Sequence, residues 1–124
     1  MKKFTLIIIS LFIFACQSSF DVNTTIKNAS GKTYLMQAPY KDTPITIIIE
    51  SGKISGFAGV NRYFGTIEVT GNNIKISNIG RTKMTGQDKL MKIEEDYIKN
   101  LQASNKITLK GKELRIGNMK FSEK

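Results

Sequence analysis

Short runs of strand-forming residues, separated by turn residues, fill the chain from Lys32 onward and restrict this region to an antiparallel sheet. The run ITIIIE at residues 45–50 is β-branched at almost every position, which predicts a strand suited to burial on both faces. Ser51-Gly52 then predicts a tight turn into the next strand. Other strands are predicted at residues 33–36, 53–57, 63–70, 73–79, 106–110, 113–116 and 119–122.

One segment, residues 88–103, has the helical period instead. Its apolar stripe comprises Leu90, Ile93, Tyr97, Ile98 and Leu101. Glu94, Glu95 and Asp96 occupy consecutive positions about 100° apart, so they cannot converge on one metal ion and are expected on a solvated face. We therefore predict an α+β fold: a small curved antiparallel β-sheet or partly open barrel with one amphipathic helix packed on it.

The start of the chain indicates an export signal. Lys2 and Lys3 precede an apolar segment, residues 4–15, that is shorter than the about 20 residues needed to span a bilayer. Cys16, the single cysteine of the chain, follows directly. This arrangement resembles the lipobox of bacterial lipoproteins, although Phe14 stands where smaller residues are commoner. The resemblance implies that the Cys16 thiol is acylated with a lipid such as palmitate.

The domain organisation expected from this signal has three parts. Residues 1–15 form a lipoprotein signal peptide, residues 16–31 form the lipidated cysteine and a flexible tether, and residues 32–124 form one domain. Gln17 resembles the residue that sends lipoproteins to the outer membrane in cells with two membranes. We expect a lipid-anchored protein of the bacterial cell envelope; the alternative is a buried N-terminal helix with a core cysteine.

Residue usage excludes many kinds of chemistry. The chain has no histidine, and with Cys16 acylated the domain has no thiol, which excludes disulfides, zinc–thiolate sites and cysteine nucleophiles. We expect no catalysis, no cofactor and no metal. The formal net charge is +9, but lysines alternate with apolar residues, so we expect a solvated basic surface and no nucleic-acid binding. Expected partners are the membrane, through the anchor, and an envelope protein, with the chain itself a monomer.

Two short motifs carry a resemblance to a known family. The first comprises Ser55, Gly56, Gly59, Asn61 and Gly65. The second, Thr82 and Met84, lies just ahead of the predicted helix. Together they resemble the META domain family, which includes HslJ-like heat-shock lipoproteins, over residues 32–122. The resemblance implies a role in envelope stress and a fold likened to pilot lipoproteins, which bind a partner's tail in a cracked barrel.

The sequence departs from the family pattern at three positions. The family's paired cysteines would fall on Val60 and Gly86, and its early tryptophan would fall near Tyr34. Loss of both cysteines together is what a dispensable disulfide predicts. The resemblance therefore implies the family's fold without a redox role.

The candidate binding residues each have two interpretations. Asn61 and Arg62 would form a polar recognition point, or Asn61 would bond its own turn. Arg81 and Lys83, on either side of Thr82 of the second motif, would bind phosphate or lipid head groups near the helix N-terminus, or would be solvated.

Four aromatic residues, Phe57, Tyr63, Phe64 and Tyr97, are expected in the core rather than around a ligand. The expected function is a membrane-anchored envelope lipoprotein with a non-catalytic binding or stress-response role. Two alternatives stay open. A pilot-like chaperone would hold an apolar peptide tail or acyl chain in an open groove between helix and sheet. A carboxylate-based hydrolase would have a pocket with two carboxylates of shifted pKa.

Overall fold

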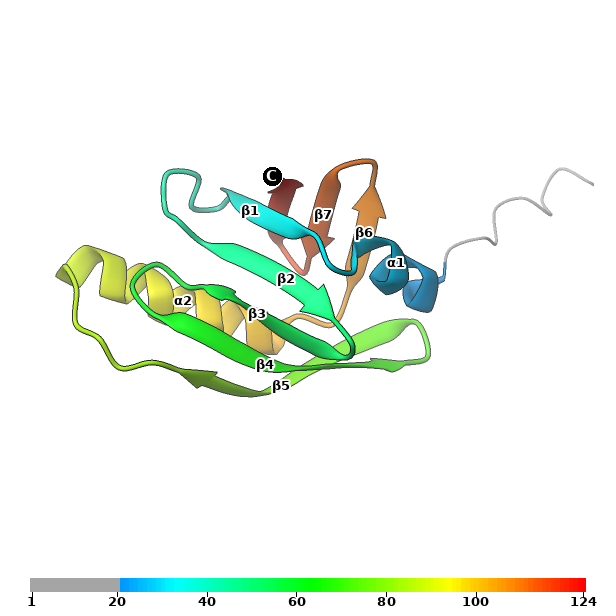
Figure 1. Ribbon diagram of the computed structural model, residues 1–124, viewed down its shortest axis with the longest axis horizontal. Helices are drawn as coiled ribbons and strands as arrows, with labels where there is room; N and C mark the ends of the chain where they lie inside the picture. The colour runs from blue at the N-terminus through cyan, green and yellow to red at the C-terminus, as the bar shows by residue number, and fades with distance from the viewer. Residues whose placement is uncertain (1–20) are drawn as a thin grey trace, which may run out of the picture.

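The computed structural model describes residues 21–124, which form two helices and one eight-stranded antiparallel sheet curled into a half-barrel (Figure 1). The predicted α+β fold with a curved sheet is confirmed. Strands lie in the order β5-β4-β3-β2-β1-β8-β7-β6, so β5 and β6 are its edges. The elements are α1 (Val22–Ala29), β1 (Thr33–Ala38), β2 (Thr46–Glu50), β3 (Lys53–Phe57), β4 (Arg62–Thr70), β5 (Asn73–Arg81), α2 (Asp88–Ala103), β6 (Ile107–Lys110), β7 (Glu113–Ile116) and β8 (Met119–Glu123).

Helix α1 lies where the sequence predicted a tether. Asp21 caps it by accepting a hydrogen bond from the backbone N–H of Asn23, and Val22 and Ala29 are fully buried. The fold therefore begins at Val22 rather than at Lys32. The helix was missed because it is short and polar, with few apolar positions to reveal its period. The predicted signal peptide and Cys16 lie outside the described residues.

The half-barrel has a buried concave face and a partly exposed convex face. In β2, Ile47 and Ile49 are fully buried, whereas Thr46 and Ile48 on the other face are half-buried. Burial of this strand on both faces, predicted from its run of isoleucines, is therefore wrong. Within residues 21–124 both helices lie on the concave side or at its rim, and β-branched residues on the outer face are covered only by their neighbours.

Helix α2 fills the hollow of the sheet through an aromatic cluster. The Tyr97 ring meets the rings of Tyr63 and Phe121 edge-on, with centroids 5.4 and 6.4 Å away. The Tyr63 hydroxyl donates to the Thr46 carbonyl oxygen at 2.8 Å, which leaves Tyr97 to donate to the Tyr63 hydroxyl at 2.6 Å. Core positions are thus confirmed for Tyr63 and Tyr97.

The other two predicted core aromatics lie on the convex face. Phe57 is half-buried and Phe64 is 55% exposed, because both occupy outward positions of their strands. The Phe64 ring lies over Gly80, its partner in β5, where a Cβ atom would come within 2.6 Å of the ring. Their prediction as core residues is therefore wrong.

Each edge strand has a helix beside it. Helix α2 lies along β5, and α1 contacts β6. Covered edges do not offer a continuous row of free backbone groups to another chain. The exception is the stretch where the chain leaves β5 and runs to the start of α2, at the end of the molecule opposite α1 (Figure 1).

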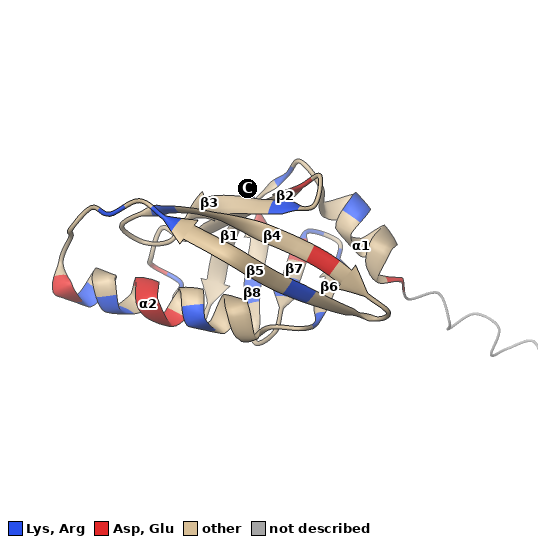
Figure 2. Ribbon diagram, turned by 90° about the horizontal axis from the view of Figure 1, so that it is seen from below, with Lys and Arg blue, Asp and Glu red and all other residues tan. Residues whose placement is uncertain are grey.

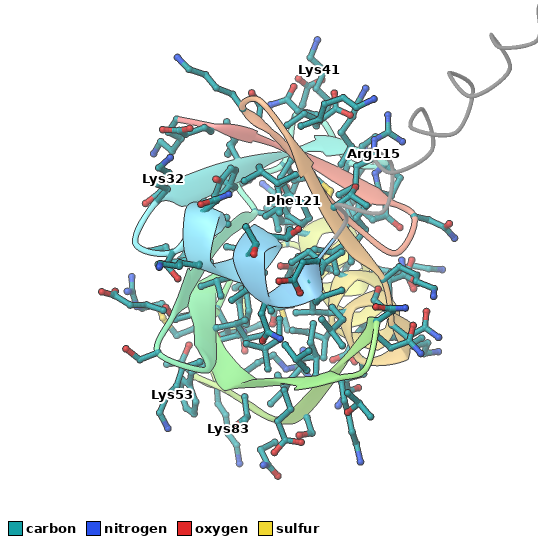
Figure 3. The ribbon with its side chains drawn as sticks, turned by 90° about the vertical axis from the view of Figure 1, so that its right-hand side faces the viewer. Lys32, Lys41, Lys53, Lys83, Arg115 and Phe121 are labelled. Atoms are coloured by element: carbon teal, nitrogen blue, oxygen red, sulfur yellow. The ribbon has the colours of Figure 1, made fainter. Side chains whose placement is uncertain are left out.

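Charged residues of both signs are spread over the faces of residues 21–124 that Figures 2 and 3 show. Basic and acidic residues are interspersed along α2 and the strands beside it (Figure 2). Viewed from the α1 end, Lys32, Lys41, Lys53 and Lys83 extend outward around the rim, while Phe121 lies behind α1 (Figure 3). This distribution matches the predicted solvated basic surface.

Candidate functional site

The two sequence motifs meet at Asn61, a buried residue between β3 and β4. Its side-chain oxygen accepts hydrogen bonds from the Thr82 hydroxyl at 2.9 Å and from the Met84 N–H at 2.6 Å. Its side-chain nitrogen donates to the Met84 carbonyl oxygen at 3.2 Å and to Glu94 at 2.8 Å. Asn61 therefore joins the connection before α2 to the sheet and to α2 itself, instead of bonding its own turn through its side chain.

Glu94 is the acidic counterpart of this network. One carboxylate oxygen accepts the backbone N–H groups of Val60 and Asn61 at 2.9 and 2.7 Å, and the other accepts the Asn61 side chain. Burial alone would raise the pKa of this carboxyl group, but the hydrogen bonds from Asn61 and Val60, together with the Arg81 charge, lower it below its usual value. Glu94 is thus a buried, ionised acceptor.

The prediction that Glu94 lies on a solvated face is wrong, since its side chain is 1% exposed. A signal for burial was present in the sequence. Glu94 lies four residues after Leu90 and four before Ile98, so it sits on the apolar stripe of α2. A carboxylate at such a position requires internal hydrogen-bond donors, which the folded β3–β4 connection and Arg81 of β5 provide.

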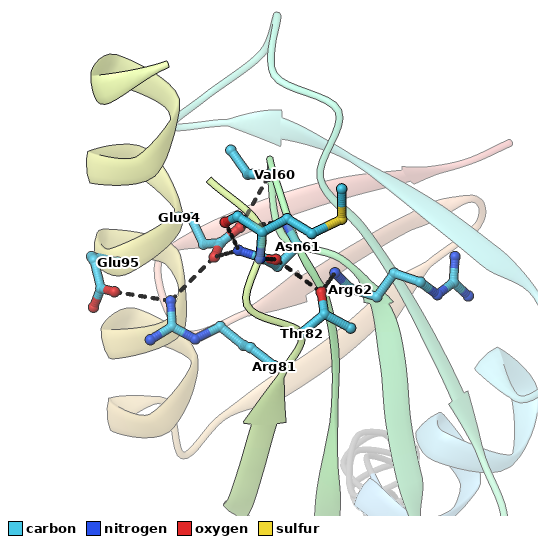
Figure 4. A network of polar contacts seen from close by, with 8 residues as sticks. Val60, Asn61, Arg62, Arg81, Thr82, Glu94 and Glu95 are labelled. Atoms are coloured by element: carbon cyan, nitrogen blue, oxygen red, sulfur yellow. Dashed lines mark hydrogen bonds and ion pairs between the residues drawn. The ribbon is translucent and has the colours of Figure 1, made fainter. Parts of the chain in front are cut away.

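Arg81, at the end of β5, completes the network (Figure 4). Its Nη1 atom lies 3.3 Å from Glu94 and 3.0 Å from Glu95, and the Arg81 side chain is 28% exposed. Two carboxylates therefore compensate its charge, which weakens the case for a phosphate site built on Arg81 and Lys83. Of these two cations, Lys83 alone has no ion pair among residues 21–124.

A pocket of about 470 Å³ opens beside this network, between residues 82–85 and the first turns of α2. Four of the predicted site residues line it: Asn61, Arg81, Thr82 and Lys83. Met84 of the second motif also lines it, and the sequence did not identify the other lining residues, Ile79, Thr85, Met91, Glu94 and Glu95, as site residues.

Arg62, the fifth predicted residue of the folded domain, is not part of the pocket wall. Its backbone N–H donates to the Thr82 hydroxyl at 3.2 Å, while its side chain extends away from Asn61 and Glu94 (Figure 4). Cys16, the predicted lipidation site, lies outside the described residues.

The first motif has direct structural reasons for its glycines. A Cβ atom on Gly56 would overlap the Thr46 carbonyl group of β2, so only glycine allows this approach of the two strands. Gly59 has φ of 122°, which side-chain-bearing residues rarely adopt, and its backbone leads directly into the Val60 and Asn61 N–H groups that bind Glu94. The motif thus shapes the loop that holds the buried carboxylate.

The positions at which the family would have paired cysteines are neighbours in space. A Cβ atom built on Gly86 would lie 3.5 Å from the Val60 Cβ atom. Disulfides join Cβ atoms at such separations. Here the Val60 side chain fills the space beside Gly86 instead.

Comparison with known proteins now decides the family. The META domain profile matches residues 22–123. The chain belongs to the META domain family. The match begins at the first residue of α1, so this helix is part of the META domain. None of the curated proteins matches the chain.

Two solved structures share the fold. An NMR structure of a protein from Burkholderia xenovorans has a TM-score of 0.60 at 16% identity, over 82% of this chain and 87% of that one. A second NMR structure has a TM-score of 0.61 at 14% identity, over 79% of this chain and 93% of the other. At these identities the likeness concerns the META fold alone.

Two further observations apply to the described region. No helix in residues 21–124 is long and apolar enough to cross a membrane. The same residues contain no cluster of three or more acidic or other metal-ligating side chains able to hold a metal ion.

Proposed function

We propose that this META domain protein is an envelope lipoprotein, anchored through Cys16, that binds a partner without catalysis at the pocket between residues 82–85 and α2. The observation that carries the proposal is the pocket itself, whose walls come from both family motifs and from α2. It combines the polar groups of Arg81 and Lys83 with the apolar side chains of Met84 and Met91. Its volume lies within the range of ligand-binding sites.

Helix α1 and the pocket lie at opposite ends of residues 21–124. Between Cys16 and Val22 the chain reaches at most about 20 Å, so anchoring would hold α1 close to the membrane. The pocket lies at the other end, beside the start of α2 (Figure 1). An anchored domain therefore presents the pocket to the envelope space rather than to the head groups of its own membrane.

The charge state of the site supports binding rather than hydrolysis. A hydrolase of the kind considered above requires a carboxylic acid able to give up a proton near neutral pH, hence one of raised pKa. The pKa of Glu94 is lowered, and its two oxygens already accept hydrogen bonds from Val60, Asn61 and Arg81. The role of Glu94 is therefore structural: it holds the loop between β3 and β4 in place.

The packing between α2 and the sheet does not favour the pilot-like alternative, which requires an open groove there. The space between α2 and the sheet is filled by Tyr63, Tyr97, Leu101 and Phe121, all buried. An acyl chain would have to displace these side chains, which pack at close contact. The pocket outside this core is the better place for a partner.

Anchoring is tested by comparing the wild-type chain with the Cys16→Ser variant in a bacterial host. The measurement is membrane fractionation together with the intact mass of the mature product. We expect an acylated product in the membrane fraction, and loss of both properties in the variant. A wild-type chain that keeps its N-terminal methionine and stays unacylated would refute the anchor.

Binding at the pocket end is tested separately by cross-linking in the living cell. A photo-reactive amino acid replaces exposed Met84 in one strain and exposed Thr24 of α1 in the control strain. Adducts with an envelope protein are expected at position 84 alone. Absence of adducts at position 84, or equal adducts at position 24, would contradict the proposed site.

A further inference from the structure

The Asn61 side chain pairs with the main chain as a strand would. It accepts the N–H of Met84 and donates to the carbonyl oxygen of the same residue. A peptide unit of a neighbouring strand offers the same acceptor and donor. On the same side, the Thr82 N–H donates to the Arg62 carbonyl oxygen at 3.1 Å. The Thr82 N–H and both main-chain groups of Met84 are therefore hydrogen-bonded on the side of β4.

The bonds of Thr82 and Met84 toward the same side indicate an extended stretch, in which the main-chain groups of residues 83 and 85 are directed to the other side. In an extended chain, successive main-chain groups point to opposite edges. Neither the N–H nor the carbonyl oxygen of Lys83 or Thr85 forms a hydrogen bond with any group in residues 21–124. Both residues line the pocket, with Met91 and Glu95 of α2 on its opposite wall. The stretch between β5 and α2 thus has one paired and one free edge.

The pocket beside the free edge has an adaptable apolar wall, and one of its two cations, Lys83, has no ion pair in the described region. Ile79, Met84 and Met91 supply apolar surface, and Met84 is 64% exposed. Methionine side chains adjust to the shape of a bound group. Lys83 adds a positive charge without an ion pair in the described region, on a chain of net charge +9.

We propose that an extended peptide segment of a partner protein pairs with the free edge at Lys83 and Thr85 as a short additional strand. Main-chain hydrogen bonds to these residues hold it, and its alternate apolar side chains lie against Ile79, Met84 and Met91. Acidic residues flanking the segment lie beside Lys83, where the basic chain attracts them. The inference rests on the proposed function, since it names the partner class and binding mode of the same pocket.

The probe is a phage-displayed library of random nine-residue peptides, selected on the complete mature chain. The decisive variant is Thr85→Pro, which removes one free N–H and keeps Met84 in the extended region. Thr85→Ala is its matched control, because it removes the side chain and keeps the N–H. Protection of the Met84 N–H from hydrogen exchange verifies that each variant retains the Asn61 pairing.

We expect selected peptides with alternating apolar residues and acidic flanks. Their synthetic forms should bind the wild type and Thr85→Ala equally and Thr85→Pro about ten-fold more weakly, as the loss of one hydrogen bond predicts. Backbone N-methylation of the peptide at the paired positions should have the same effect. Equal binding to Thr85→Pro, or no peptides enriched on the wild type over that variant, would overturn the inference. The proposed function is tested independently of this result, by the cross-linking at position 84.

Discussion

The two ends of this META domain are built on different physical principles. At the α1 end, Val22 and Ala29 are buried in the core, and the Gly31 N–H donates to the Ile49 carbonyl oxygen at 2.9 Å. At the other end, α2 is joined to the sheet through the ionised Glu94 and the Asn61 amide, and a pocket remains beside them. Apolar packing stabilises the α1 end, whereas hydrogen bonds and ion pairs join α2 to the sheet at the pocket end. The difference predicts distinct responses to mutation, pH and cross-linking.

Removal of the Glu94 carboxylate should have the largest effect, because it leaves buried donors without an acceptor. We expect Glu94→Ala to lower the free energy of unfolding by about 3 to 5 kcal/mol, measured by urea denaturation. The matched control is Glu95→Ala, which removes an exposed carboxylate that also pairs with Arg81 and should cost less than about 1 kcal/mol. Equal losses in the two variants would show that the polar network does not hold this end.

A covalent link across the pocket end should stabilise it. In the double variant Val60→Cys with Gly86→Cys, oxidation should join the two residues and raise the free energy of unfolding by about 3 kcal/mol relative to the reduced form. The measurement is urea denaturation with and without reductant, and the single variants are controls. Failure of the two thiols to pair would mean that the loops lie farther apart than described.

At the α1 end, loss of packing should be the only consequence of mutation. We expect Val22→Ala to cost about 2 kcal/mol, since it leaves a small cavity beneath α1, while the exposed neighbour variant Asn23→Ala costs little. Thermal unfolding monitored by circular dichroism measures both. A neutral Val22→Ala variant would indicate that α1 does not belong to the cooperative core.

Acid should weaken the pocket end through protonation of Glu94, and less strongly than deletion of its carboxylate. The pKa of Glu94 is lowered in the folded state from the model-compound value of 4.5, so its ionised form stabilises the fold fully above that value. The contribution falls as the pH drops through the lower, folded-state pKa. We therefore expect the stability difference between wild type and Glu94→Gln to shrink below about pH 4.5. A difference that stays constant down to pH 2 would contradict this linkage.

The alternation of apolar and polar residues predicted most of the sheet, because strands buried on one face have this pattern in their sequence. The strands Lys53–Phe57 and Glu113–Ile116 and the helix Asp88–Ala103 have the bounds that were predicted. Helix α1 was missed because its stability comes from tertiary packing of a short polar segment rather than from its own period.

The site was predicted only in part, since its polar partners come from distant segments. Asn61, Arg81, Thr82 and Lys83 were recognised as candidates, but nothing local in the sequence indicated that Asn61 pairs with Met84. Glu94 was assigned to solvent although it lies on the apolar stripe of its helix. Polar residues on apolar stripes therefore merit a search for distant donors.

Hydrogen exchange of the amides between β5 and α2 distinguishes the two edges of this stretch. The N–H groups of Thr82 and Met84 are bonded toward β4, whereas those of Lys83 and Thr85 have no partner within residues 21–124. We expect slow exchange at residues 82 and 84, fast exchange at residues 83 and 85, and loss of protection at Met84 in the Asn61→Ala variant. Uniform exchange rates across these residues would contradict a segment with one paired and one free edge.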